Sequence, residues 1–332
     1  MTPVIRARGL VKDYGPVRAL RGVDLEVHPG EVFGFLGPNG AGKSTTIRLL
    51  MDLLRPTAGT VEIFGLTPAA GGAGLRTRIG YLPGELAFPA RLDAGEYLRY
   101  LAALRAGRGG ARIGELAQRF SLDLSRPLQA LSKGNRQKVG LVQAFMHEPD
   151  LLVLDEPTSG LDPLLQREFR LLAQESVARG ATIFLSSHML GEVEEVAGRV
   201  AIIREGRVVD VDDVRALRAR AGQQVLLRFA EPVSLAEFAG LPGVQDAVLD
   251  PSDGVSLSCL LRGDPMPLLL AAARHRVVRW QVQDRELEDL FLDFYRPPER
   301  ASPQDGTTAG PAGTGTGTGT GAGAGTQQEP VR

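Results

Sequence analysis

The fold of this chain is decided by Gly37-Pro38-Asn39-Gly40-Ala41-Gly42-Lys43-Ser44-Thr45, which fits the phosphate-binding pattern G-x-x-x-x-G-K-[ST]. A buried strand is predicted just before it, at 32–36, and apolar residues at helical spacing follow it. Such a loop turns successive backbone N–H groups toward phosphate oxygens, and the positive end of the new helix points at the same atoms. The stretch therefore predicts a bound nucleoside triphosphate.

Two side chains of this loop have separate tasks. Lys43 would neutralise the β- and γ-phosphates, and the hydroxyl of Ser44 would bind Mg²⁺. The bare pattern also occurs by chance in glycine-rich chains, but the strand before it and the helix after it make that much less frequent. We therefore expect all residues from Gly37 to Thr45 to bind nucleotide, with ATP and Mg²⁺ as the cofactors.

Composition narrows the possible functions. The 332 residues leave room for one large or two medium domains, and the hydrophobic content of 43% is typical of a globular protein. A formal net charge of −1 gives no general attraction to nucleic acid, and the single cysteine, Cys259, excludes an internal disulfide. The N-terminus lacks the apolar core of a signal peptide, and no run approaches the roughly 20 apolar residues that span a bilayer. We expect the chain to reach a membrane only through a partner.

Two further predicted strands end in polar residues. The apolar run at 151–154 leads into Asp155 and Glu156, as in a central parallel strand whose C-terminal end reaches a ligand crevice. Asp155 could hold Mg²⁺, and Glu156 could orient and polarise a water molecule. The strand at 182–187 has the same design and leads into His188. A lone histidine is more often structural, but this one shares its sheet with the phosphate loop and the acidic pair.

The order of predicted elements divides the chain. Residues 1–220 read as one α/β domain, which begins with antiparallel strands and is mostly helical at about 85–150. Residues 223–296 read strand-helix-strand-strand-helix-strand, the ferredoxin-like order of a small α+β domain. A closing helix is predicted around 287–294. Residues 297–332 are rich in glycine and threonine, cannot bury apolar area and are predicted to be disordered.

Taken together, these motifs resemble the nucleotide-binding subunit of ATP-binding cassette (ABC) transporters over roughly residues 4–215. The phosphate loop, the strand ending in Asp155 and Glu156, and His188 follow one another in the family's order. The resemblance implies an α/β P-loop NTPase cassette with an antiparallel β subdomain and a helical subdomain. It also implies that Glu156 polarises the attacking water and that His188 stabilises charge on the γ-phosphate.

Other residues receive a role from the resemblance alone. Tyr14 stands where the family has the aromatic side chain that stacks on adenine, and Asp162 ends the loop that crosses to the opposite subunit. The signature, normally Leu-Ser-Gly-Gly-Gln, is Leu-Ser-Lys-Gly-Asn at 131–135. It keeps Ser132 and Gly134, which contact the γ-phosphate of the ATP bound by the other subunit. A second ABC subunit, identical or different, is therefore expected.

The sequence departs from the family at two places. Gly84 stands where a glutamine is usual in the loop that links the nucleotide to the membrane subunit, and Glu85 follows it. In the signature, Lys133 adds a positive charge near a phosphate site and Asn135 is a shorter amide than glutamine. We interpret the signature changes as tolerated variation, with reduced or more tightly coupled turnover as an alternative.

The single cassette, the small C-terminal domain and the ending Glu288-Asp289-Leu290-Phe291-Leu292 resemble subunits of bacterial multidrug or antibiotic exporters. The resemblance implies an ATPase that dimerises on ATP and drives a separate membrane permease from the cytoplasmic face of the membrane. A soluble regulatory ABC-type ATPase that is not coupled to transport is the alternative. Cassettes that act on ribosomes or DNA usually carry a second cassette, a coiled coil or zinc modules, so no nucleic-acid partner is expected.

Overall fold

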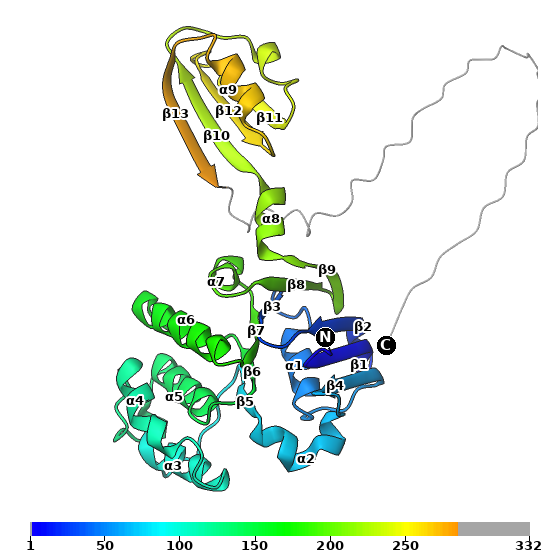
Figure 1. The fold of residues 1–332 in the computed structure, drawn as a ribbon, viewed down its shortest axis with the longest axis vertical. Helices are drawn as coiled ribbons and strands as arrows, with labels where there is room; N and C mark the ends of the chain where they lie inside the picture. The colour runs from blue at the N-terminus through cyan, green and yellow to red at the C-terminus, as the bar shows by residue number, and fades with distance from the viewer. Residues whose placement is uncertain (1, 285–332) are drawn as a thin grey trace, which may run out of the picture. The chain divides into compact units, whose positions relative to one another are not determined.

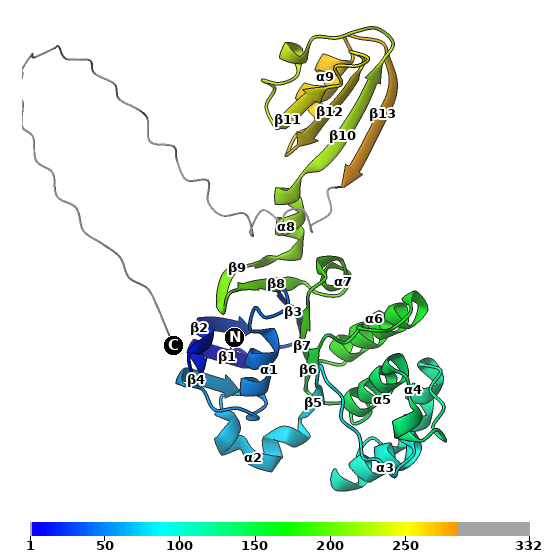
Figure 2. The ribbon, with the colours of Figure 1, turned by 180° about the vertical axis from the view of Figure 1, so that it is seen from behind.

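The fold is that of a computed structural model, which describes residues 2–284 (Figures 1 and 2). The predicted closing helix at 287–294 and the predicted disorder at 297–332 lie outside this range.

A six-stranded sheet in the order β5-β6-β7-β3-β8-β9 positions the site. Neighbouring strands are parallel except at the β8–β9 edge, which is antiparallel. The strands are β3 (Val32–Leu36), β5 (Ile79–Leu82), β6 (Leu151–Asp155), β7 (Thr182–Ser187), β8 (Arg199–Arg204) and β9 (Arg207–Asp213). Every residue of β3, β6 and β7 is buried, which explains the apolar runs within them. The parallel strands end at one edge, so the segments that follow β3, β6 and β7 are brought together.

A second sheet, in the order β2-β1-β4, is antiparallel. It comprises β1 (Ile5–Tyr14), β2 (Val17–Val27) and β4 (Ala58–Ile63). Its buried side chains share one hydrophobic core with Phe33 and Phe35 of β3 and with Ile47 of α1 (Lys43–Leu50). The alternation of buried and exposed residues along β2 is the pattern of a sheet with one face on the core. This is the expected antiparallel β subdomain, and the predicted fold class is confirmed.

The remaining elements of this part of the chain are helices. They are α2 (Pro68–Thr77), α3 (Ala94–Leu104), α4 (Ile113–Arg119), α5 (Lys133–Phe145), α6 (Pro163–Ala178), α7 (Leu190–Glu194) and α8 (Val214–Ala221), with single 3₁₀ turns η1 (Gly110–Arg112) and η2 (Leu128–Ala130). The helix α3 begins with a capping box between Asp93 and Glu96. No local signal predicts α2, because this helix carries three glycines and is kinked at Gly72.

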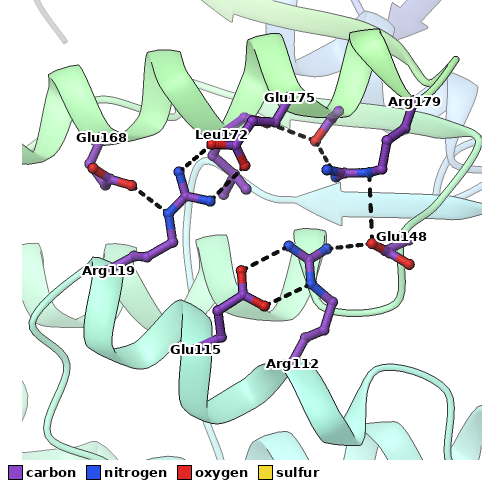
Figure 3. A network of polar contacts seen from close by, with 9 residues as sticks. Arg112, Glu115, Arg119, Glu148, Glu168, Leu172, Glu175 and Arg179 are labelled. Carbon is purple, nitrogen blue, oxygen red and sulfur yellow. Dashed lines mark hydrogen bonds and ion pairs between the residues drawn. The ribbon is translucent and has the colours of Figure 1, made fainter.

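Ion pairs connect the helical region to α6 (Figure 3). Arg119, the last residue of α4, donates hydrogen bonds to Glu168 and Glu175 of α6. Nearby, Arg112 bonds Glu115 and Glu148. Two guanidinium groups thus pair with four carboxylates, and the bonds of Arg119 hold α4 against α6 in addition to apolar packing.

The C-terminal domain forms its own antiparallel sheet in the order β11-β12-β10-β13. Its elements are β10 (Gln223–Phe229), η3 (Leu235–Glu237), β11 (Val244–Leu249), β12 (Ser256–Leu261), α9 (Met266–Ala272) and β13 (Val277–Asp284). Because β12 lies between β10 and β11, this is the split β-α-β arrangement of ferredoxin-like folds. The first predicted helix is reduced to the turn η3. Cys259 lies in the core of this domain, and burial raises the pKa of its thiol to about 11.

Candidate nucleotide-binding and hydrolysis site

The loop between β3 and α1 packs closely against neighbouring backbone. Gly40 and Gly42 have φ angles of 81° and 112°, which favour glycine. A methyl group on Gly37 would lie 2.5 Å from the carbonyl oxygen of Ile203, so no larger residue fits there. Gly42 is the N-cap of α1 and supplies no side-chain cap, which leaves the first N–H groups of the helix for another acceptor. This is the geometry of an anion site at a helix N-terminus.

Lys43 is held inside this loop. Its side chain is only 6% exposed, and its Nζ atom donates hydrogen bonds to the carbonyl oxygens of Gly37 at 2.6 Å and Pro38 at 3.3 Å. The same Nζ atom lies 3.3 Å from Oε1 of Glu156. A phosphate group in the loop would therefore compete with Glu156 for the charge of Lys43.

The carboxylate of Glu156 lies between two partners. Its Oε1 faces Lys43, and its Oε2 lies 2.7 Å from Nδ1 of His188. Glu156 also has a left-handed backbone with φ of 51°, an uncommon conformation for a residue with a side chain. Two of the predicted catalytic side chains, Glu156 and His188, are thus in direct contact although 32 residues separate them.

Ser186 fixes both acids from the neighbouring strand. Its hydroxyl donates a 2.6 Å hydrogen bond to Oδ1 of Asp155, and its Oγ and carbonyl oxygen accept from the backbone N–H of Glu156 at 3.1 and 3.2 Å. Ser186 was not among the residues predicted for the site. The available signal was that β7 ends in small polar residues, but only the parallel register shows that Ser186 stands beside Asp155.

Gln137 of α5 is a second residue that the sequence analysis missed. It is buried, and its side-chain nitrogen donates to the carbonyl oxygens of Glu156 at 3.0 Å and Pro157 at 2.9 Å. These two bonds hold the turn after β6 against α5, the helix that begins in the signature. Its only sequence signal is a polar residue on an otherwise buried face of α5.

One cleft of about 440 Å³, within the size range of small-molecule sites, is lined by Lys43, Asp155, Glu156 and His188 together with other residues of the phosphate loop. The predicted residues that line it are Pro38, Asn39, Gly40, Gly42, Lys43, Ser44, Thr45, Asp155, Glu156 and His188. Further lining residues that were not among the predicted ligands are Ala19, Arg48, Gly84, Glu85, Lys133 and Ser159. Gly37 and Ala41 belong to the loop but do not line the cleft. The edge of the central sheet thus gathers phosphate-binding, acidic and basic groups in one place.

Besides Gly37 and Ala41, four predicted ligands lie outside this lining. Ser132 caps α5 by accepting from the N–H of Asn135, and Asp162 caps α6 by accepting from the N–H of Leu165 at 3.0 Å. A methyl group on Gly134 would lie 2.7 Å from the carbonyl oxygen of Gly160, so the signature packs directly on the turn after β6. Tyr14 ends β1 with 43% of its surface exposed. None of these four residues lines the cleft of its own chain.

Comparison with known proteins supports the same interpretation. A family model described as ABC transporter matches residues 20–159. The daunorubicin/doxorubicin resistance ATP-binding protein DrrA of Streptomyces peucetius is 35% identical over 304 residues, which cover 88% of this chain and 92% of DrrA. A fluoroquinolones export ATP-binding protein of Mycobacterium tuberculosis is 37% identical over 302 residues, covering 88% of this chain and 93% of the relative.

Solved structures agree in fold. The structure of an ATP-binding subunit of an ABC transporter is 33% identical, with a TM-score of 0.61, and covers 65% of this chain and 92% of that chain. A dimeric bacterial ABC transporter cassette, 23% identical with a TM-score of 0.57, covers 64% of this chain and 99% of that chain and shares the fold. Within residues 2–284, no helix has the length and apolar character that a membrane span requires.

The family gives the coarse function. ATP-binding subunits of ABC transporters pair as dimers and work with transmembrane permeases. The cleft, the phosphate loop and the match to such subunits along most of the chain agree on ATP binding and hydrolysis. This chain belongs to the ABC transporter family, as an ATP-binding subunit that hydrolyses ATP.

Proposed function

We propose that this chain powers the export of drugs, antibiotics or other small molecules through a separate membrane permease, from the cytoplasmic face of the membrane. The support is that relatives named for daunorubicin/doxorubicin resistance and fluoroquinolone export match it along 88% of its length, including the C-terminal domain. The regulatory alternative, an ATPase uncoupled from transport, has no comparable support.

The observation that carries the proposed chemistry is the placement of the Glu156 carboxylate between Lys43 and His188. When the loop holds the phosphates of ATP, Lys43 pairs with them and Glu156 is released to polarise the attacking water. His188, already oriented by Glu156, stabilises the charge that develops on the γ-phosphate. Gln137 and Ser186 keep the backbone of Glu156 in place during this exchange.

The residues at this site fit Mg²⁺. The Ser44 hydroxyl and the Asp155 carboxylate line the same cleft, and Oδ1 of Asp155 accepts from Ser186, which leaves Oδ2 as the oxygen for a metal. Mg²⁺ commonly binds one or two protein oxygens together with phosphate oxygens and water, so a large carboxylate cluster is not required. When bound by Ser44 and Asp155, the ion would neutralise charge on the phosphates.

A second cassette would complete the site. Ser132 and Gly134 stand at the N-terminus of α5, outside the cleft of their own chain, and we propose that they contact the γ-phosphate held by the other subunit. Asp162 would lie in the same interface, and Tyr14 would stack on adenine. The partner cassette is either a copy of this chain or a related one.

Replacement of the proposed catalytic carboxylate tests this function. Glu156→Gln should reduce ATP turnover by at least roughly a hundredfold while ATP binding persists, because the amide cannot accept the proton of water. Glu231→Gln, which changes an exposed acid outside the cleft, should leave turnover unchanged. Size-exclusion chromatography of Glu156→Gln with Mg²⁺ and ATP should show a dimer.

Export is tested in cells that produce the chain together with its permease. Efflux of an anthracycline should be lost with Glu156→Gln and retained with Glu231→Gln. Unchanged turnover in Glu156→Gln would refute the catalytic assignment. Lost turnover with unchanged efflux would refute export and favour the regulatory alternative.

A further inference from the structure

The C-terminal domain has a recess that the ATPase chemistry does not use. The helix α9 lies along one face of its sheet (Figure 1). Phe238 of the β10–β11 connection and Leu268 of α9 belong to the buried core of this domain. Because side chains alternate along strands, residues such as Leu226 and Ser258 point to the opposite face. A recess of about 470 Å³ lies there, close in volume to the nucleotide cleft and within the range of small-molecule sites.

Two arginines stand side by side in this recess. Arg228 of β10 and Arg279 of β13 are directly opposite each other in the antiparallel register, and both line the recess. Residues in that position have Cβ atoms about 5 Å apart, and like charges placed so are destabilising. Among residues 2–284, neither guanidinium group makes a hydrogen bond or a close ion pair. The sheet therefore keeps a repulsive pair that a bound anion would neutralise.

The nearby acids are engaged elsewhere. Asp250 lines the recess, but its Oδ1 accepts hydrogen bonds from the backbone N–H and hydroxyl of Ser252. Asp253 accepts from Ser256 and from the N–H of Val255, and these bonds, helped by the charge of Arg228, hold its pKa below the usual value. Both carboxylates thus shape the β11–β12 loop, and although Asp253 feels the charge of Arg228, neither acid forms a close ion pair with the two arginines.

An apolar row lies next to the charged one. Leu226 of β10 is paired with Ser258 of β12, which is also paired with Val248 of β11. Leu226 is 37% exposed and Val248 is 59% exposed, and both line the recess. The recess therefore offers two guanidinium groups beside an apolar platform with a serine hydroxyl between its two side chains.

We propose that this recess binds a small anionic molecule with an apolar body. The anionic group lies against Arg228 and Arg279, whose planar guanidinium groups suit carboxylate, sulfonate or phosphate oxygens. The apolar body covers Leu226 and Val248. The recess consists of residues of the C-terminal domain alone, so the proposal does not depend on export or on the catalytic assignment.

The test uses the full chain with saturating non-hydrolysable ATP analogue, so that the nucleotide cleft is occupied. The probe is 8-anilinonaphthalene-1-sulfonate, and its neutral counterpart is N-phenyl-1-naphthylamine, which lacks the sulfonate. Fluorescence titration should show that Arg228→Gln and Arg279→Gln each weaken sulfonate binding roughly tenfold, with a larger loss in the double variant. Arg274→Gln removes an exposed positive charge outside the recess and should change nothing.

Three results would overturn the proposal. The first is that the unaltered chain does not bind the sulfonate probe. The second is that the double variant binds this probe as tightly as the unaltered chain does. The third is that the unaltered chain binds the neutral probe as tightly as the sulfonate probe. ATP turnover should be the same in the double variant and the unaltered chain. A failure here is therefore distinguishable from a failure of the proposed function, which Glu156→Gln tests separately.

Discussion

Gly84 and Asp155 are so close that a methyl group added to Gly84 would lie 2.9 Å from Oδ2 of the Asp155 carboxylate. The backbone of Gly84 does not have a left-handed φ, so this contact, and not the backbone conformation, is what excludes a side chain. The usual glutamine of the family would have to displace either the loop or the acid that we propose as a Mg²⁺ ligand. The lack of a side chain at Gly84 thus leaves room for the carboxylate of Asp155.

We therefore expect Gly84→Ala and Gly84→Gln to impair ATP hydrolysis. Displacement of Asp155 should raise the Mg²⁺ concentration needed for half-maximal turnover several-fold, because the oxygen that we propose for the metal moves. Steady-state ATPase assays over a range of Mg²⁺ concentrations measure this. Gly74→Ala, where the added methyl group meets no atom within 4 Å, is the matched control. A Gly84→Gln variant with unaltered Mg²⁺ dependence would show that the contact has no functional consequence.

Ser186→Ala should also weaken the site. The change removes the hydroxyl that donates to Asp155 and leaves the carboxylate free to rotate. We expect about tenfold lower turnover at limiting Mg²⁺, partly restored at high Mg²⁺. Ser176→Ala removes another buried serine hydroxyl, one that bonds the carbonyl oxygen of Leu172 in α6, and should leave Mg²⁺ dependence unchanged. Equal effects of the two substitutions would contradict a specific role for Ser186.

Arg119→Met should lower the free energy of unfolding by about 1–3 kcal/mol. Arg119 bridges Glu168 and Glu175 (Figure 3), and its hydrogen bonds are the main reason that the pKa of Glu175 lies below its usual value. Urea unfolding of the purified variant measures the loss. Arg126→Met, which removes an exposed arginine 3.5 Å from Asp123, should change stability little and serves as control. Equal stability of the two variants would refute the bridge.

His147 should make the fold sensitive to acid. It is buried, with Nε2 3.2 Å from the carbonyl oxygen of Ile79, and burial lowers its pKa to about 4, from an ordinary value of 6.5. Because the folded-state pKa is the lower one, the neutral ring stabilises the fold above pH 6.5. This contribution, up to about 3 kcal/mol, is lost as the pH falls from 6.5 to 4.

The pH dependence is measured by comparing the unaltered chain with His147→Gln in urea unfolding at several pH values. As the pH falls from 6.5 to 4, the unaltered chain should lose stability relative to His147→Gln, because glutamine does not titrate. A difference that stays constant from pH 7 to pH 4.5 would show that the histidine does not titrate with a lowered pKa.

Much of the fold was predictable because its signals are local. The phosphate loop between a strand and a helix, the apolar runs of β6 and β7, and the ferredoxin-like element order are each contained in a short stretch of sequence. The kinked, glycine-rich helix α2 was not predictable, because its residues favour turns and its helical state depends on packing. The assigned roles of the individual site residues stay predictions.

The sequence by itself determined the P-loop fold, the ATPase family and most of the residues that line the cleft. Only the tertiary structure decided which side chains touch. The contact of Glu156 with both Lys43 and His188, the bond from Ser186 to Asp155 and the absence of space beside Gly84 all join residues that are distant along the chain. Parallel strands bring their carboxyl ends together through backbone hydrogen bonds that any sequence can make, so the register that aligns these groups is fixed by packing of the whole sheet.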